Sequence, residues 1–140
     1  MTIKQISIFV ENKSGSLLQV LNLLKDNGIS IIISTLSDTQ DFGIYRVICS
    51  DTDKAFSILR EKGINVTVTN VYAIRLADNK VGAAAEVMAQ LTESGLGIKY
   101  MYSFLLEGKG VIVFRADDNE KANEIVMLKK LDFLTEGDLK

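Results

Sequence analysis

The chain has 140 residues, of which 47% are hydrophobic and 24% charged, and its formal net charge at pH 7 is −2. This balance excludes extended disorder, and the length allows one ordinary domain or two small ones. A charge so near zero gives no electrostatic reason to bind nucleic acid, and no apolar run approaches the ~20 residues of a membrane helix.

The composition also removes several kinds of chemistry. The chain has no histidine and a single cysteine, Cys49, so histidine-based acid–base, nucleophilic and zinc schemes are excluded. An internal disulfide is excluded as well, which fits a reducing cytoplasm. Residues 1–9 alternate like a strand and lack the apolar block of a signal peptide. We therefore expect a cytoplasmic protein that is not an enzyme, with no cofactor and no metal site.

An internal repeat is the strongest signal in the sequence. A constant shift of 67 positions carries residues 3–59 onto residues 70–126 without gaps. It gives 12 identities in 57 pairs, and glycines at element boundaries fall in register. Such a pattern indicates a duplicated module of about 70 residues.

The first copy reads as strand, helix, two strands, helix and strand. Alternating apolar residues predict the first strand, helical spacing of leucines predicts the first helix, and β-branched residues predict the second strand. Asn12 or Ser14 can cap the first helix, and Ser50 and Asp51 the second. The predicted elements are a strand around Ile6–Val10, a helix from Leu17 to Gly28, strands Ile29–Leu36 and Ile44–Cys49, a helix ending at Gly63, and a strand Ile64–Val68.

The second copy follows the same order, with one irregularity. Its apolar residues Tyr72, Ile74 and Leu76 lie one position out of phase with Ile6 and its neighbours, which predicts a bulge or one extra loop residue near Ala77. The predicted elements are a strand near 71–77, a helix 82–94, strands 96–106 and 110–116, a helix 118–129 and a strand near 131–135.

Two βαββαβ units predict an α+β, ferredoxin-like architecture. Right-handed crossovers favour the sheet order 4-1-3-2 within each unit. Because an exposed apolar edge is a liability, we expect the units to pair into one eight-stranded antiparallel sheet with the helices on one face. The expected domains are residues 1–70 and 71–140.

These residues resemble an ACT domain. The resemblance rests on Ile6-Ser-Ile-Phe-Val-Glu-Asn-Lys-Ser-Gly-Ser-Leu17, on Asn27-Gly28-Ile29, and on the turn Asp38-Thr-Gln-Asp-Phe-Gly43. The whole chain is similar to small stand-alone proteins made of two ACT domains and nothing else. The resemblance implies a regulatory module that binds a small ligand, usually an amino acid, at the interface between two ACT units.

The resemblance also implies where the ligand binds: in the loop before the helix glycine and on a strand of the facing unit. A helix N-terminus supplies donors for a carboxylate, and glycine lets a ligand approach the backbone closely. The position before the glycine is often proline in the family and is Ser14 or Val81 here. The expected ligand-binding residues are Asn12, Lys13, Ser14, Gly15, Ser16, Leu17, Ser34 and Ser37, together with Asn79, Lys80, Val81, Gly82, Tyr100, Met101 and Tyr102.

Most of these residues also have a purely structural interpretation. Gly15 and Gly82 suit any tight strand-to-helix turn, Asn12 and Asn79 suit helix caps, and Lys13 and Lys80 suit a solvated surface. Tyr100 and Tyr102 either line a pocket or simply cover the sheet. Outside the site, a buried role is expected for Cys49, turn formation for Asp38 and Asp41, and capping for the acidic run 117–120.

Three functional classes remain open. The preferred one is a non-catalytic sensor of a free amino acid, acting by allosteric regulation. The alternative is a regulatory subunit acting in trans on an enzyme of amino-acid metabolism, in the manner of acetolactate synthase small subunits. An RNA-recognition module also runs βαββαβ, but Phe9 and Tyr45 are a thin aromatic match. We expect no nucleic-acid and no membrane partner, and homodimer formation stays open.

Overall fold

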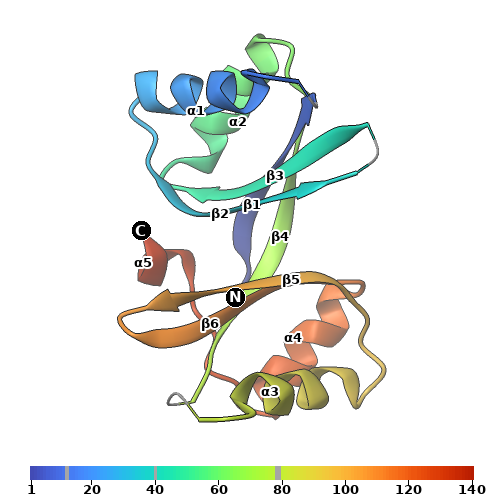
Figure 1. Cartoon of the computed structure of the whole chain (residues 1–140). Helices are drawn as coiled ribbons and strands as arrows, with labels where there is room; N and C mark the ends of the chain where they lie inside the picture. Colours follow the sequence, from blue (N-terminus) through green and yellow to red (C-terminus); the bar gives the residue numbers. More distant parts are fainter. Residues whose placement is uncertain (12, 40, 78–79) are drawn as a thin grey trace. The chain divides into compact units, whose positions relative to one another are not determined.

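The computed structural model of the chain describes residues 1–11, 13–39, 41–77 and 80–140. It divides into two compact units: an N-terminal unit of residues 4–69 with Lys140, and a C-terminal unit of residues 1–3 with 70–139 (Figure 1). The elements are β1 (Ile3–Glu11), α1 (Ser16–Asp26), β2 (Ile31–Asp38), β3 (Phe42–Cys49), α2 (Thr52–Glu61), β4 (Val66–Arg75), α3 (Ala83–Thr92), β5 (Ile98–Leu106), β6 (Lys109–Ala116), α4 (Asn119–Leu128) and α5 (Glu136–Leu139).

In the N-terminal unit, β3 lies between β1 and β2 and is antiparallel to both. Neighbouring residues of a strand point to opposite faces of the sheet, so every second side chain points toward the helices. Figure 1 shows α1 and α2 on the same side of this sheet. The core holds buried residues of both helices and of that strand face: Ile6, Ile8, Val10, Val20, Leu24, Ile29, Tyr45, Val47, Cys49, Ala55, Leu59 and Val66.

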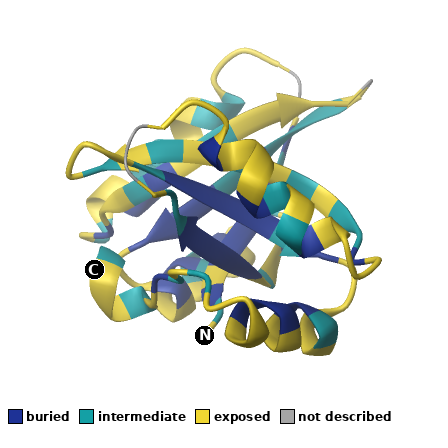
Figure 2. Cartoon of the chain, turned by 90° about the horizontal axis from the view of Figure 1, so that it is seen from below, coloured by how far each residue is buried: buried dark blue, intermediate teal, exposed yellow. Residues whose placement is uncertain are grey.

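The C-terminal unit has a core of its own, built by β4, β5 and β6 with α3 and α4. Tyr72 and Phe114 face each other across β4 and β6, and their rings stack with centroids 5.3 Å apart. The other buried members are Ile74, Val87, Leu91, Leu96, Ile112, Ala116, Ala122, Ile125 and Val126. Figure 2 shows that the strands carry most of the buried residues, while the helices are buried along one side.

The prediction of an eight-stranded sheet is wrong, because the described residues form a sheet of six strands. They hydrogen-bond in the order β2-β3-β1-β4-β6-β5. The predicted strands Ile64–Val68 and 71–77 form one continuous strand, β4, since no glycine or proline separates them. The predicted strand near 131–135 is reduced to a single bridge between Ile74 and Phe133. The order within the N-terminal unit is the one that right-handed crossovers favour.

Local geometry repeats between the two units. The pairing of β2 with β3 shifts register between Ile31 and Ile33, and that of β5 with β6 shifts between Ile98 and Tyr100, which are the same positions under the 67-residue shift. The Asp51 carboxylate accepts from the Lys54 N–H at 3.1 Å, and Asp118 accepts from Lys121 at 3.1 Å. The prediction that Asp51 and the acidic run 117–120 supply helix caps is confirmed at Asp51 and Asp118.

Strand register locates the irregularity predicted near Ala77. Ile6 lies opposite Val47, and Tyr72 lies opposite Phe114, so Tyr72 takes the place of Ile6. The Leu76 N–H donates to the Gly110 oxygen at 2.8 Å, which continues this register. Residues of β1 therefore correspond to those of β4 at a shift of 66, whereas the later strands and the helices correspond at 67. The one extra residue lies in the loop between Leu76 and Gly82.

The first helix of each unit begins at a glycine. Gly15 and Gly82 are the N-cap residues of α1 and α3, with φ angles of 89° and 84°, and no side chain of the described residues caps either helix. The prediction that Ser14 caps α1 is therefore wrong, and Asn12 lies outside the described residues. Because only glycine adopts this left-handed conformation without strain, a plain turn requirement is sufficient to explain both glycines.

Lys130 occupies the position where the first copy has Gly63, and both have left-handed φ angles, 52° and 74°. A residue with a Cβ is strained in this region by roughly 1 kcal/mol. We expect Lys130→Gly to raise the free energy of unfolding by about 1 kcal/mol, measured by urea denaturation. Lys129→Gly is the control, since Lys129 has a φ of −85° and glycine there only adds unfolded-state entropy. Equal effects at both positions would contradict the strain argument.

Candidate functional site

A pocket of about 390 Å³ lies in the N-terminal unit, where β1 ends and α1 begins. We call it the first pocket. Its described lining comes from β1, the loop after it, the start of α1, the start of β3 and the link from α2 to β4: Phe9, Val10, Glu11, Lys13, Ser16, Gln19, Val20, Phe42, Gly63, Ile64 and Asn65. The pocket thus brings together residues that are more than 50 positions apart in the sequence.

Backbone pairing explains why the pocket opens here. The Phe9 N–H donates to the Asn65 oxygen at 3.0 Å. Before Asn65 the chain turns away through Gly63, which ends α2 in a left-handed conformation, while β1 continues to Glu11. Since N–H groups of a strand alternate in direction, the N–H of Glu11 points to the same side as that of Phe9. The last residues of β1 therefore border the pocket.

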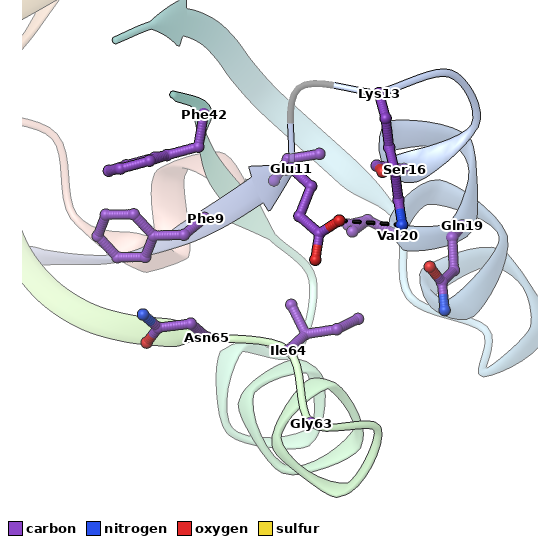
Figure 3. A pocket seen from close by; sticks show the side chains of 11 residues that line it. Phe9, Glu11, Lys13, Ser16, Gln19, Val20, Phe42, Gly63, Ile64 and Asn65 are labelled. Atoms are coloured by element: carbon purple, nitrogen blue, oxygen red, sulfur yellow. Dashed lines mark ion pairs between the residues drawn. The ribbon is translucent and has the colours of Figure 1, made fainter. Parts of the chain in front are cut away.

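The first pocket combines an aromatic wall with an ion pair (Figure 3). The rings of Phe9 and Phe42 meet edge to face with centroids 5.5 Å apart. The Glu11 carboxylate contacts the Lys13 ammonium group at 3.0 Å, and Figure 3 shows this pair between the aromatic rings and the side chains of α1. Both charged side chains are exposed, so water screens the pair and it adds little stability. Charged groups of a ligand can therefore replace either member of the pair at little cost in stability.

A second pocket, of about 360 Å³, lies at the equivalent place in the C-terminal unit. The Arg75 N–H donates to the Asp132 oxygen at 2.8 Å, as Phe9 does to Asn65. Its described lining residues are Ile74, Arg75, Leu76, Ala77, Ala83, Glu86, Val87, Gln90, Lys109, Lys129, Lys130, Leu131 and Asp132. Under the repeat, Ser16, Val20 and Ile64 of the first pocket become Ala83, Val87 and Leu131.

Two of the residues predicted for the ligand site, Lys13 and Ser16, line the first pocket. Ser14 is exposed and Leu17 packs partly buried against the core. Gly15 is not in the lining but begins α1 beside it. The loop thus lies next to the pocket, although not every residue in it reaches the cavity, and its role in ligand binding stays a prediction.

In the second copy none of the predicted residues that the structure describes lines the pocket. Lys80 forms an ion pair with Glu86 at 3.0 Å, and Glu86 does line it. Val81 is 98% exposed, and Gly82 begins α3. The predicted Asn79 lies outside the described residues. The second loop is therefore linked to its pocket by the ion pair of Lys80 with Glu86.

The predicted residues of the second strands lie on β2 and β5. Ser34 is opposite Val47 on the helix side, whereas Ser37 is opposite Ile44 on the other face and accepts from Arg46 at 3.1 Å. Tyr100 and Tyr102 share one face of β5 and Met101 lies on the other, by strand alternation. These strands line neither pocket, and the role of these residues in binding stays a prediction.

Sequence reasoning missed the aromatic wall and Glu11. Phe9 and Phe42 belong to two different strands, and their contact depends on a register that the sequence did not give. A signal was present at Phe9, because an apolar residue there interrupts the alternation of apolar and polar positions in β1. Gly63 and its two following residues were interpreted only as a helix stop and a strand.

Outside the two pockets, the described residues offer neither a reactive thiol nor a metal-binding cluster. Burial raises the pKa of the Cys49 thiol above its usual value, so the neutral, unreactive form is favoured. Cys49 is fully buried, as predicted. Among the described residues no three His, Cys, Asp or Glu side chains gather to hold a metal ion. None of the helices in the described part of the chain has the length and apolar character to span a bilayer.

The family described as the ACT domain pair matches residues 1–140, and the chain belongs to this family. Protein BT0572 from Bacteroides thetaiotaomicron is 39% identical in sequence, with a TM-score of 0.92 over 99% of this chain and 96% of that one. The regulatory subunit of aspartate kinase from Thermus thermophilus, in its ligand-free form, is 14% identical, with a TM-score of 0.62 over 89% and 90% of the two chains. The aspartokinase alpha and beta subunits give 18% identity and a TM-score of 0.60 over 91% and 93%. No match was found among curated proteins.

Proposed function

We propose that this chain is a non-catalytic regulatory sensor that binds a free amino acid in the first pocket. The observation that carries the proposal is the ion pair of Glu11 and Lys13, which lies in the pocket beside the start of α1. A free amino acid carries one positive and one negative group. Its carboxylate can pair with Lys13 and its ammonium group with Glu11, so that the net charge of the pocket does not change.

The rest of the pocket favours an amino acid with an apolar or aromatic side chain. Phe9 and Phe42 form an edge-to-face pair on one side, and Val10, Val20 and Ile64 add aliphatic surface. An apolar wall with a few charged groups is the usual composition of a small-molecule site, and about 390 Å³ is within the range of such pockets.

Regulation would follow from linkage between ligand binding and conformation. A ligand that binds one arrangement of the protein better than another shifts the equilibrium toward it, and such couplings are typically about 1–3 kcal/mol. That the ligand lies at an interface between two ACT units, and that the chain acts in trans on an enzyme of amino-acid metabolism, both remain part of the proposal. The first would place a second unit over the open side of the pocket.

The RNA-recognition alternative loses its support. Tyr45 lies opposite Ile8 in the helix-side core, and Phe9 lies opposite Ile44 on the other face of the strands. RNA-binding sheets of this type stack bases on aromatic residues that share one exposed face. Phe9 and Tyr45 cannot form such a surface together.

The proposal predicts that one amino acid, or a small group with apolar side chains, stabilises the protein. A ligand at 100 times its Kd raises the free energy of unfolding by about 2.7 kcal/mol. Thermal unfolding with each of the twenty amino acids, followed by circular dichroism, measures this as a rise in Tm. No rise with any of them would contradict the proposal.

Phe42→Ala should weaken binding of the stabilising amino acid about tenfold, because it removes half of the aromatic wall. Isothermal titration calorimetry compares the variant with the unchanged protein. Phe104→Ala is the matched control, since Phe104 is a partly buried aromatic residue of β5 that does not line the pocket. Equal affinity of the Phe42→Ala variant and the unchanged protein would place the ligand elsewhere.

A further inference from the structure

The two pockets share a backbone but differ in side-chain chemistry. Register makes Arg75 the equivalent of Phe9, because Phe9 lies opposite Ile44 and Arg75 opposite Val111. The repeat makes Lys109 the equivalent of Phe42. Both members of the aromatic wall are thus replaced by cations in the second pocket.

A third difference between the pockets also adds a cation to the second one. Lys130 stands where the first pocket has Gly63, and it keeps the left-handed backbone conformation that suits glycine. Strained non-glycine residues of this kind occur preferentially at functional sites, where the side chain is needed. The strain at Lys130 is therefore a second observation, independent of charge, that points to a role for this lysine.

The acidic residues in the described lining of the second pocket, Glu86 and Asp132, already have partners. Arg75 contacts Asp132 at 3.0 Å, and Lys80 contacts Glu86 at 3.0 Å. Lys129 contacts Glu93 at 3.8 Å. Within residues 1–11, 13–39, 41–77 and 80–140, Lys109 and Lys130 form no ion pair.

We propose that the second pocket binds a small dianion, either phosphate-bearing or a dicarboxylate, with Lys109 and Lys130 as its principal charged contacts. Two cations that have no acidic partner among the described residues, around one cavity of about 360 Å³, attract two negative charges. The first pocket offers one cation and one carboxylate, and suits a zwitterion. The chain therefore carries two sites of different specificity. This inference concerns a separate site and stands whether or not the first pocket binds an amino acid.

The test is a titration of the 15N-labelled full chain at low ionic strength, followed by backbone amide shifts. The probes are inorganic phosphate and succinate, with uncharged succinamide for comparison. We expect saturable shifts at residues 83–87 and 129–132 with at least one dianion and none with succinamide. The equivalent residues 16–20 and 63–65 of the first pocket serve as an internal reference. The responding dianion identifies which of the two chemistries is recognised.

Two variants identify the contacts. Lys109→Gln and Lys130→Gly should each weaken dianion binding about tenfold, the effect of losing one charge-assisted contact. Lys130→Gly restores the residue of the first copy and relieves backbone strain, so it tests the site without endangering the fold. Lys62→Gln is the control, because Lys62 is exposed and lines neither pocket.

Three results would overturn the proposal: no saturable shift with either dianion, shifts spread over surface lysines outside the pocket, or unchanged affinity in both variants. Failure here is distinguishable from failure of the amino-acid proposal. The latter is tested by the effect of Phe42→Ala on amino-acid binding, and Phe42 lines the first pocket and not the second.

Discussion

Leu91→Ala is expected to lower the free energy of unfolding by about 3 kcal/mol. Leu91 is fully buried on α3, within the core of the C-terminal unit. Alanine removes most of its apolar contacts and leaves a cavity that the surrounding strands cannot fill. Urea denaturation measures the loss. Leu128→Ala is the control, since Leu128 is 77% exposed and its truncation should change the value by less than about 0.5 kcal/mol.

The repeat supplies a matched second variant. Leu24 is the equivalent of Leu91 on α1 and is 1% exposed, so Leu24→Ala should cost a similar amount. Amide hydrogen exchange would then show which residues lose protection in each variant. If residues 1–70 and 71–140 behave as separate domains, Leu91→Ala speeds exchange in the second range only, and Leu24→Ala in the first. A loss below about 1 kcal/mol in either variant would contradict the core assignment.

Tyr72→Phe is expected to cost about 1–2 kcal/mol, because it removes a buried hydroxyl from its acceptors. The hydroxyl contacts the Asn119 carbonyl oxygen at 2.9 Å and also the Asn123 side-chain oxygen. Phenylalanine keeps the stack on Phe114, so the variant isolates the hydroxyl. Tyr45→Phe is the control. Tyr45 is buried in the other core, and its hydroxyl has no hydrogen bond within the described residues.

The same residue predicts a pH dependence. Burial first, and the charge of Asp118 second, raise the pKa of the Tyr72 phenol above its usual value of 10.0. Because the folded state holds the proton more tightly, this contribution is present below the unfolded pKa and is lost as pH rises through the folded one. The stability difference between the unchanged protein and Tyr72→Phe should therefore narrow above about pH 10. A stability difference between the two proteins that stays constant through and above this pH would contradict the prediction.

Most of the fold could be predicted from the sequence because the repeat compares each element with a second copy. Gly28 and Gly63 correctly marked helix ends, and Asp51 and Asp118 correctly marked helix starts. The strand count failed at β4. The run from Val66 to Arg75 has no glycine or proline, so nothing interrupts the strand, and the expectation of two complete units overrode this signal.

The candidate site was harder to predict than the fold. The loop with Lys13 was implied by the resemblance to ACT domains, and the anion-binding character of a helix N-terminus agrees with it. Phe9 and Phe42 come into contact only through the pairing of β1 with β3, and sequence alone does not fix strand register. Arg75 was not recognised as the partner position of Phe9, because one inserted residue changes the shift from 67 to 66 within the strand.

The continuous strand β4 has a consequence for how such a chain can change during evolution. Residues 1–3 belong with residues 70–139, and the boundary between the units falls inside β4. A break in the gene between the codons of residues 69 and 70 would therefore not release two complete units. It would divide β4 and separate residues 1–3 from residues 70–139. The two copies therefore depend on one shared strand and are expected to be kept together. The residues that line each pocket can still change independently.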